Sequence, residues 1–189
     1  MFLLRNQLCL IGLYICAIEM VIMDIFKCEK QDLIRVQKIA ELTWSDTYKE
    51  ILSVEQSVFM LEWMYNLETL LKQMEEGHQF HILIKDGEDV GFIGTQNNYP
   101  SSGETKLHKI YVQPSLQGTG AGRLLMEKVE RLARGNQSDF LVLNVNRYNK
   151  AKDFYIKLGF DISYEEDIDI GNGFLMEDYV MKKRLSELL

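Results

Sequence analysis

The chain is poor in cysteine and histidine, with three of each among 189 residues. The cysteines, Cys9, Cys16 and Cys28, are odd in number and show no paired spacing. That usage is typical of free thiols in a reducing compartment and predicts a cytoplasmic protein. His78 and His81 lie three residues apart, but no further ligand follows at a useful spacing. We therefore predict no metal site.

Basic residues are also in deficit, because 21 Lys and Arg stand against 28 Asp and Glu, a formal net charge of -7. A nucleic-acid-binding protein needs a basic face for the phosphates, so this balance argues against a nucleic acid partner. The apolar run of residues 8–18 is too short to cross a membrane and is followed by Glu19. We therefore expect no membrane partner.

The same apolar run has the length of a signal-peptide core, but no small-x-small cleavage site follows it. We expect residues 1–22 to be an apolar extension, residues 23–184 to form one domain, and residues 185–189 to be a short tail. A signal or anchor segment at 8–18 remains the alternative. The length of the chain suits a single domain with a sizeable core.

What the chain does contain is a glycine-rich stretch at residues 107–122, LHKIYVQPSLQGTGAG. It predicts a strand that ends before Pro114, a loop with three glycines in five positions, and the start of an amphipathic helix. Backbone N–H groups of such a loop, together with the positive end of the helix, form a cradle for phosphate. A Walker loop would need Lys and Ser or Thr after Gly122, where Arg123 and Leu124 stand. A dinucleotide fingerprint would need Gly or Ala at position 123 and an early place in the chain.

The arrangement Gln117-x-x-Gly120-x-Gly122, preceded by Ile-Tyr-Val at 110–112, resembles the pyrophosphate loop of the GNAT family of N-acetyltransferases. A second stretch, AKDFYIKLGF at 151–160, resembles the helix and Gly-Phe turn that follow in that family. The resemblance covers about residues 23–184. In places the sequence is also similar to the branch of the family that includes bacterial spermidine/spermine acetyltransferases.

The resemblance implies an α/β fold with a mixed, mostly antiparallel sheet flanked by helices, in which the strands at 104–112 and 140–145 run parallel. Periodicity and turn signals place the elements independently. Strands are expected at 23–27, 79–85, 90–95, 104–112, 140–145, 162–170 and 174–181, and helices at 31–44, 54–64, 67–74, after the glycine-rich loop, and at 149–158.

Acetyl-CoA is the co-substrate that the resemblance implies, with strand backbone for the pantetheine arm and the glycine-rich loop for the pyrophosphate. Arg123 would add positive charge. The family's usual Asn falls on Tyr148 here, which is flanked by Asn146 and Asn149; we assign the asparagine contact to Asn149, with Asn146 as the alternative. The predicted coenzyme A contacts are Ile110, Tyr111, Val112, Gln117, Gly118, Thr119, Gly120, Ala121, Gly122, Arg123 and Asn149.

Two side chains are candidates for catalysis. Tyr155 matches the family's frequent general acid, which would protonate the departing thiolate; the alternative is that it only packs the helix. His108 stands where many members carry a basic Glu, and strand alternation would put it on one face with Ile110 and Val112. A half-buried structural histidine is the alternative for His108, and Glu104 is a second candidate base.

The predicted function is therefore transfer of an acetyl group to a primary amine of a small molecule in a ternary complex. An acidic run near the C-terminus favours a polyamine-like amine, although such runs are usually solvated faces. A non-catalytic acyl-CoA-binding module and an enzyme acting on a protein or peptide N-terminus are the alternatives, and the resemblance also allows a homodimer. The run consists of Asp161, Glu165, Glu166, Asp167, Asp169, Glu177 and Asp178.

Overall fold

The structure is a computed structural model, and it describes residues 23–185. The predicted extension at 1–22, with Cys9 and Cys16, lies outside the described residues, as do residues 186–189 of the predicted tail. Cys28 is buried and carries a free thiol.

A seven-stranded sheet forms the centre of the fold, in the order β1-β2-β3-β4-β5-β7-β6. Every neighbouring pair is antiparallel except β4 and β5, which are parallel. The predicted mixed sheet with one parallel pair is thereby confirmed. In chain order the elements are β1 Met23–Lys27, η1 Lys30–Asp32, α1 Leu33–Tyr48, α2 Val54–Tyr65, α3 Leu67–Glu75, β2 His78–Lys85, β3 Glu88–Asn97, β4 Glu104–Val112, η2 Pro114–Leu116, α4 Ala121–Gly135, β5 Phe140–Asn146, α5 Ala151–Lys157, β6 Asp161–Gly171 and β7 Phe174–Arg184.

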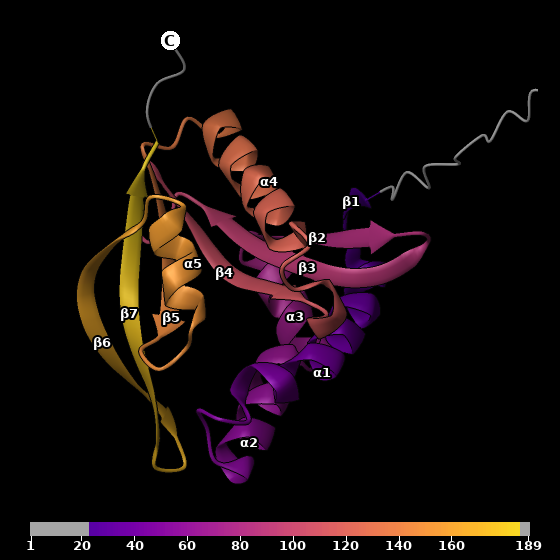
Figure 1. Cartoon of the computed structure of the whole chain (residues 1–189), viewed down its shortest axis with the longest axis vertical. Coiled ribbons are helices and arrows are strands. Elements are labelled where there is room, and N and C mark those ends of the chain that lie inside the picture. Colours follow the sequence, from indigo (N-terminus) through magenta and orange to yellow (C-terminus); the bar gives the residue numbers. More distant parts are fainter. Residues whose placement is uncertain (1–22, 186–189) are drawn as a thin grey trace, which may run out of the picture.

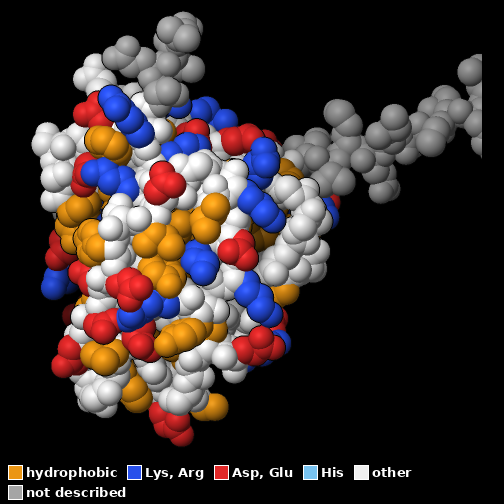
Figure 2. Space-filling model, turned by 60° about the vertical axis from the view of Figure 1, so that its left-hand side comes forward, with side chains coloured by type: hydrophobic (Ala, Val, Ile, Leu, Met, Phe, Trp, Pro, Cys, Tyr) orange, Lys and Arg blue, Asp and Glu red, His pale blue; other side chains and the backbone are white. Residues whose placement is uncertain are grey.

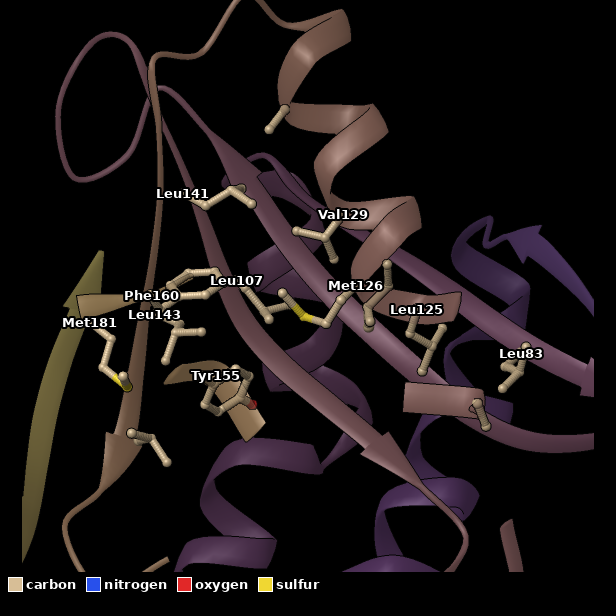
Figure 3. Packing of buried hydrophobic residues seen from close by; sticks show 14 of the residues in the cluster. Leu83, Leu107, Leu125, Met126, Val129, Leu141, Leu143, Tyr155, Phe160 and Met181 are labelled. Carbon is tan, nitrogen blue, oxygen red and sulfur yellow. The ribbon is translucent and has the colours of Figure 1, made fainter. Parts of the chain in front are cut away.

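Helices cover both faces of this sheet (Figure 1). The amphipathic helix α4 buries Leu125, Met126 and Val129 against one face, where α5 joins it (Figure 3). Helices α1, α2 and α3 pack on the other face around a second core that contains Trp44 and Tyr65. The sheet is thus covered on both sides over its central strands, and the apolar side chains of β2, β3 and β4 are divided between the two cores.

The helices on the second face begin at side-chain caps that the sequence supplies. The Ser53 hydroxyl oxygen accepts a hydrogen bond from the Gln56 N–H at 3.1 Å, and Asn66 Oδ1 accepts one from the Thr69 N–H at 2.8 Å. Each cap satisfies one backbone donor that the first helical turn leaves unpaired. The chain therefore turns sharply between α2 and α3 without burying an unpaired N–H group at Thr69.

A β-bulge interrupts β4 beside β3. Gly94 pairs with Lys109 and Thr95 pairs with Leu107, so His108 is the extra residue. Leu107, Ile110 and Val112 pack toward α4, whereas His108 stacks on His78 on the opposite face. The prediction that His108 shares a strand face with Ile110 and Val112 is therefore wrong, because the bulge shifts the two-residue alternation by one.

The parallel pair β4 and β5 is joined only from Glu104↔Phe140 to Leu107↔Leu143, and beyond this point the strands separate. The Gln113 N–H donates to the Val90 carbonyl at 2.8 Å. Because bonded and non-bonded pairs alternate along an antiparallel ladder, the N–H and C=O groups of Ile110 and Val112 point away from β3. The fold thus presents an unpaired strand edge to the gap between β4 and β5.

On the surface, acidic and basic side chains are interspersed over the face seen in Figure 2. Within residues 23–185, no helix has the length and apolar character that a membrane crossing requires.

Candidate active site

A cleft of about 930 Å³ opens where β4 and β5 separate. One of its walls is made by the glycine-rich loop and α5, which lie on the α4 side of the sheet. The opposite wall is made by the end of α1, the segment after it, and the β6–β7 hairpin. The cleft therefore passes through the sheet, and two ligands can reach its middle from opposite faces.

The glycine-rich loop is shaped for an anion. Gly118 and Gly120 have φ angles of 80° and 95°, in the left-handed region, and a Cβ at either position would point into open space. Helix α4 begins directly after Gly120, and its first intrahelical bond runs from the Leu124 N–H to the Gly120 carbonyl. The N–H groups of the first turn therefore have no partner within the helix. They lie at the positive end of the helix dipole, which is the end next to the cleft.

Tyr155 lies on α5 beside Leu143 and Phe160, and its ring is almost fully buried (Figure 3). The side chain also lines the cleft. Burial, and then the neighbouring Tyr48, raise the pKa of the Tyr155 phenol. The hydroxyl group therefore carries its proton at neutral pH, the state that a general acid needs.

Asn149 holds the start of α5. Its Oδ1 accepts a hydrogen bond from the Ala151 N–H at 2.8 Å, while the residue also lines the cleft. Of the predicted site residues, all but Thr119 and Ala121 line the cleft. The Thr119 hydroxyl donates to the Leu116 carbonyl at 2.7 Å, and the Ala121 side chain is buried in the core beneath the loop.

His108 lines the cleft from the bulge, and its ring lies 4.2 Å from that of His78, centroid to centroid. Its Nε2 is 3.0 Å from Gln96 Oε1. Burial, and then the neighbouring His78, Lys106 and Lys109, lower the pKa of His108 to about 2, and burial lowers that of His78 to about 4. Both rings are neutral at physiological pH.

The stability of the fold should fall with acidification because of these rings. In the unfolded chain both have a pKa near ~6.5, so the unfolded state binds more protons as the pH drops from there toward the folded values. Their contribution is complete above the unfolded pKa and is lost below it. We expect the melting temperature to fall by roughly 5 °C between about pH 7 and pH 5. A His78→Gln, His108→Gln double variant should show a shallower fall, and parallel curves for the two proteins would contradict this assignment.

Four polar residues missed by the sequence prediction, or seen only as part of the acidic run, face the α1 side of the cleft. They are Lys106, Lys109, Asn144 and Asp178. Asn144 Nδ2 donates to Asp178 Oδ2 at 3.4 Å and to Glu166 Oε2 at 3.2 Å. Burial raises the pKa of Asp178. Of these four residues, only Asp178 belonged to a pattern noted in the sequence, the acidic run.

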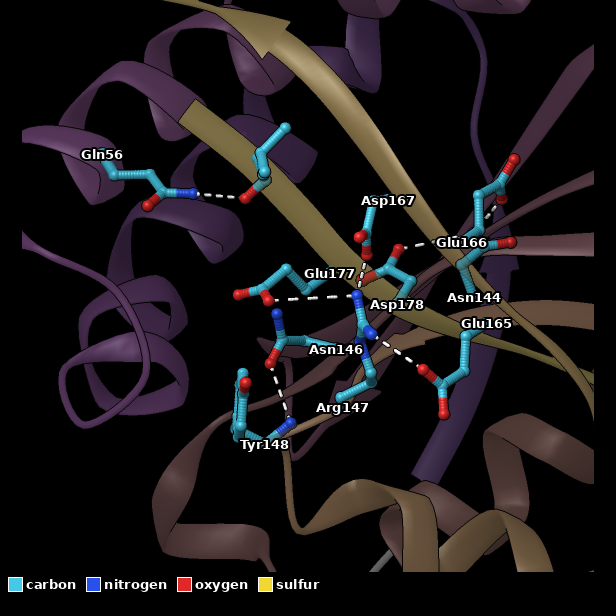
Figure 4. A network of polar contacts seen from close by, with 11 residues as sticks. Gln56, Asn144, Asn146, Arg147, Tyr148, Glu165, Glu166, Asp167, Glu177 and Asp178 are labelled. Carbon is cyan, nitrogen blue, oxygen red and sulfur yellow. Dashed lines mark hydrogen bonds and ion pairs between the residues drawn. The ribbon is translucent and has the colours of Figure 1, made fainter. Parts of the chain in front are cut away.

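Three carboxylates of the acidic run serve another purpose. Arg147, whose side chain is only 18% exposed, lies 2.8 Å from Glu165 and 3.9 Å from Glu177, and also contacts Asp167 (Figure 4). One guanidinium group thus ties together carboxylates of β6 and β7. Among the charges of the run, Asp161, Glu166, Asp169 and Asp178 have no basic residue within ion-pair distance in the described part of the chain, and of these Asp178 lines the cleft.

Comparison with known proteins gives a consistent result. The family model described as "Acetyltransferase (GNAT) domain" matches residues 45–183. An uncharacterized N-acetyltransferase from the pepI 3′ region of Lactobacillus delbrueckii subsp. lactis is 27% identical over 168 residues, which cover 85% of this chain and 96% of that protein. The [ribosomal protein bS18]-alanine N-acetyltransferase of Haemophilus influenzae is 27% identical over 114 residues, covering 60% of this chain and 75% of that protein.

Among solved structures, the PaiA N-acetyltransferase of Thermoplasma acidophilum in complex with coenzyme A superimposes with a TM-score of 0.72 and 25% identity. The match covers 87% of this chain and 99% of that chain. The chain therefore belongs to the GNAT family of acetyltransferases and is an N-acetyltransferase that uses acetyl-CoA as its co-substrate.

Proposed function

We propose that this enzyme transfers the acetyl group to a primary amine of a small molecule by direct attack within a ternary complex. The observation that carries the proposal is the cleft through the sheet, which is open to the glycine-rich loop on one face and to a separate polar wall on the other. A thioester held from the first side and an amine held from the second can meet without a covalent enzyme intermediate.

The residues present fit coenzyme A. The free N–H groups at the start of α4 suit a pyrophosphate, and the open space above Gly118 and Gly120 allows it to approach the backbone closely. The free edge of β4 at Ile110 and Val112 offers an N–H and a C=O from each residue to the amide groups of the pantetheine arm. When bound, acetyl-CoA supplies an activated acetyl group.

In the reaction an N–C bond forms and the C–S bond breaks. The acceptor ammonium gives up one proton before attack, the attacking nitrogen loses a second on forming the amide, and the thiolate takes one up. Tyr155 is the residue that would supply that proton, because its buried phenol remains protonated.

His108 is the base that the sequence predicts, but its lowered pKa makes its ring a weak proton acceptor for an amine. Asp178 is better suited to be the general base. Burial raises its pKa, Asn144 orients it, and it lines the acceptor side of the cleft.

A polyamine-like acceptor is the finer prediction from the sequence. Its structural support is the unpaired carboxylate of Asp178, with Glu166 beside it, since both could attract an ammonium group. Three other carboxylates of the run are held by Arg147 and do not add to this attraction. A peptide N-terminus is the second candidate acceptor, favoured by the likeness to the enzyme from Haemophilus influenzae.

The direct test is release of free coenzyme A thiol from acetyl-CoA in the presence of single amines. The panel holds spermidine, amino acids, an aminoglycoside and peptides that begin with alanine. Amine-dependent release, with the acetylated amine found by mass spectrometry, is the expected result and identifies the acceptor class. Stabilisation by acetyl-CoA without release from any amine would instead support the non-catalytic binding module.

A further inference from the structure

Lys109 is the one lysine that is buried among residues 23–185, with 5% of its surface exposed. The bulge in β4 directs its side chain to the α1 face, where its ammonium nitrogen lies 5.0 Å from the centroid of the Tyr65 ring. Gly94 makes room for it, since a Cβ there would come within 3.4 Å of the Lys109 Cβ and 3.1 Å of the Phe80 ring. The residue also lines the cleft.

No carboxylate of the described residues offsets the charge of Lys109. Lys182 and Lys183 of β7 are paired with Glu104 and Glu130, whereas no acidic side chain within residues 23–185 comes within ion-pair distance of Lys109. Burying an ammonium group without a counter-ion is costly, and a contact with an aromatic face recovers only part of that cost. Burial alone lowers the pKa of Lys109 to about 8, so the ammonium form still prevails at neutral pH. Lys109 is therefore a buried cation without a counter-ion in the described part of the chain, in a residue that lines the cleft.

The other wall of the same cleft has the opposite character. Asp178 is 8% exposed, and among the described residues the Asn144 amide is its one hydrogen-bond donor, with Glu166 next to it. Lys106 of β4 lines the same cleft, and the charges of Glu166 and Asp178 act on it. The acceptor side of the cleft is thus polarised, with an unpaired cation on β4 and an unpaired anion on β7.

We propose that the acceptor carries a carboxylate close to its reactive amine, as an amino acid does, and that Lys109 binds this carboxylate. The inference rests on the proposed transfer to a small-molecule amine and defines its substrate class. Asp178 faces the ammonium group of the same molecule. An acceptor with only positive groups would leave Lys109 unpaired and would place further cations near it, which Coulomb repulsion disfavours.

The test compares amines that differ only in a carboxylate. The pairs are lysine and cadaverine, leucine and 3-methylbutylamine, and phenylalanine and 2-phenylethylamine. Thiol release is measured at saturating acetyl-CoA, and kcat/KM is compared within each pair. We expect the carboxylate to raise kcat/KM by roughly 10- to 100-fold in at least one pair, the range for a charge-assisted hydrogen bond.

Lys109→Met removes the charge and keeps an unbranched side chain, whereas Lys109→Arg keeps the charge. In Lys109→Met the preference for the carboxylate should vanish because the acid loses activity while the matching amine does not. Lys109→Arg should retain part of the preference. Lys27→Met, a change at an exposed lysine of β1, is the matched control and should leave every ratio unchanged.

Inhibition provides a measurement that needs no variant. Hexanoate, a carboxylate without an amine, should compete with the amino acid on the wild-type enzyme, and not on Lys109→Met if that protein folds. The inference is overturned if the amines without carboxylate react as well as the acids, or if Lys109→Met slows both members of a pair equally. Release from peptides alone, with none from any pair, also overturns it. If no amine of any kind releases thiol, the proposed transfer to a small-molecule amine has itself failed, which is a distinguishable result.

Discussion

A Gly120→Glu variant is expected to lose at least ~100-fold in affinity for coenzyme A, equivalent to about 2.7 kcal/mol. Gly120 has a φ of 95° and stands directly before α4, with open space where a side chain would be added. The new carboxylate would occupy the place of the pyrophosphate and repel it, and the left-handed backbone would be strained as well. Titration calorimetry with coenzyme A measures the loss.

The effect of backbone strain must be distinguished from the effect of losing the anion-binding site. Gly87 offers a matched control, because its φ is 84° and a Cβ there would also meet open space, but it lies in the β2–β3 turn. Gly87→Glu should lower the melting temperature to a similar degree and leave coenzyme A binding intact. Equal affinities in the two variants would show that the glycine-rich loop does not bind the diphosphate.

The glycine-rich loop and the strand before it could be predicted because their determinants are local. Pro114 ends β4, the glycines allow the left-handed turns, and the apolar spacing of α4 sets its buried face. The predicted bounds 104–112 coincide with β4, and every other predicted strand and helix overlaps its observed counterpart. Local backbone preferences and hydrophobic periodicity agree over this stretch, which makes prediction from sequence reliable there.

The sequence contains a signal for the bulge at His108, which a strict two-residue alternation does not detect. Leu107, Ile110 and Val112 are spaced by three and then two, so a strict two-residue period cannot put all three on one face. The consecutive polar residues His108 and Lys109 mark the slip. Once the bulge is assumed, Lys109 rather than His108 is directed toward Tyr65, with Gly94 making room for it.

Other features depend on contacts that no local pattern encodes. The place where β4 separates from β5 is set by where their backbone pairing ends, and the paired residues lie more than thirty positions apart in the sequence. The grouping of carboxylates around Arg147 follows from the β6–β7 register, which places Glu166 opposite Asp178 and Asp167 opposite Glu177. Read in sequence, these acids formed one run. In the fold, three of them neutralise an arginine, and Asp178 reaches the cleft.

Tyr155→Phe is expected to lower kcat by roughly 100-fold, toward the lower end of the range for loss of a general acid. A thiol of pKa near ~8.5 leaves more easily than an alcohol, so the proton from Tyr155 helps departure without being its sole driving force. The phenylalanine ring should keep the packing against Leu143 and Phe160 in the α5 core. Binding of coenzyme A and the melting temperature should therefore change little.

Tyr179→Phe is the matched control, since Tyr179 packs against the same core from β7 but does not line the cleft. Its kcat should equal that of the wild type. If Tyr155→Phe retained full turnover, Tyr155 would be a packing residue, and the thiolate would depart with a proton from water or without one. If instead Tyr155→Phe lost coenzyme A binding along with turnover, the hydroxyl group would hold the co-substrate rather than protonate it. Only a loss confined to kcat assigns the proton to Tyr155, because packing and binding would both appear in the other two measurements.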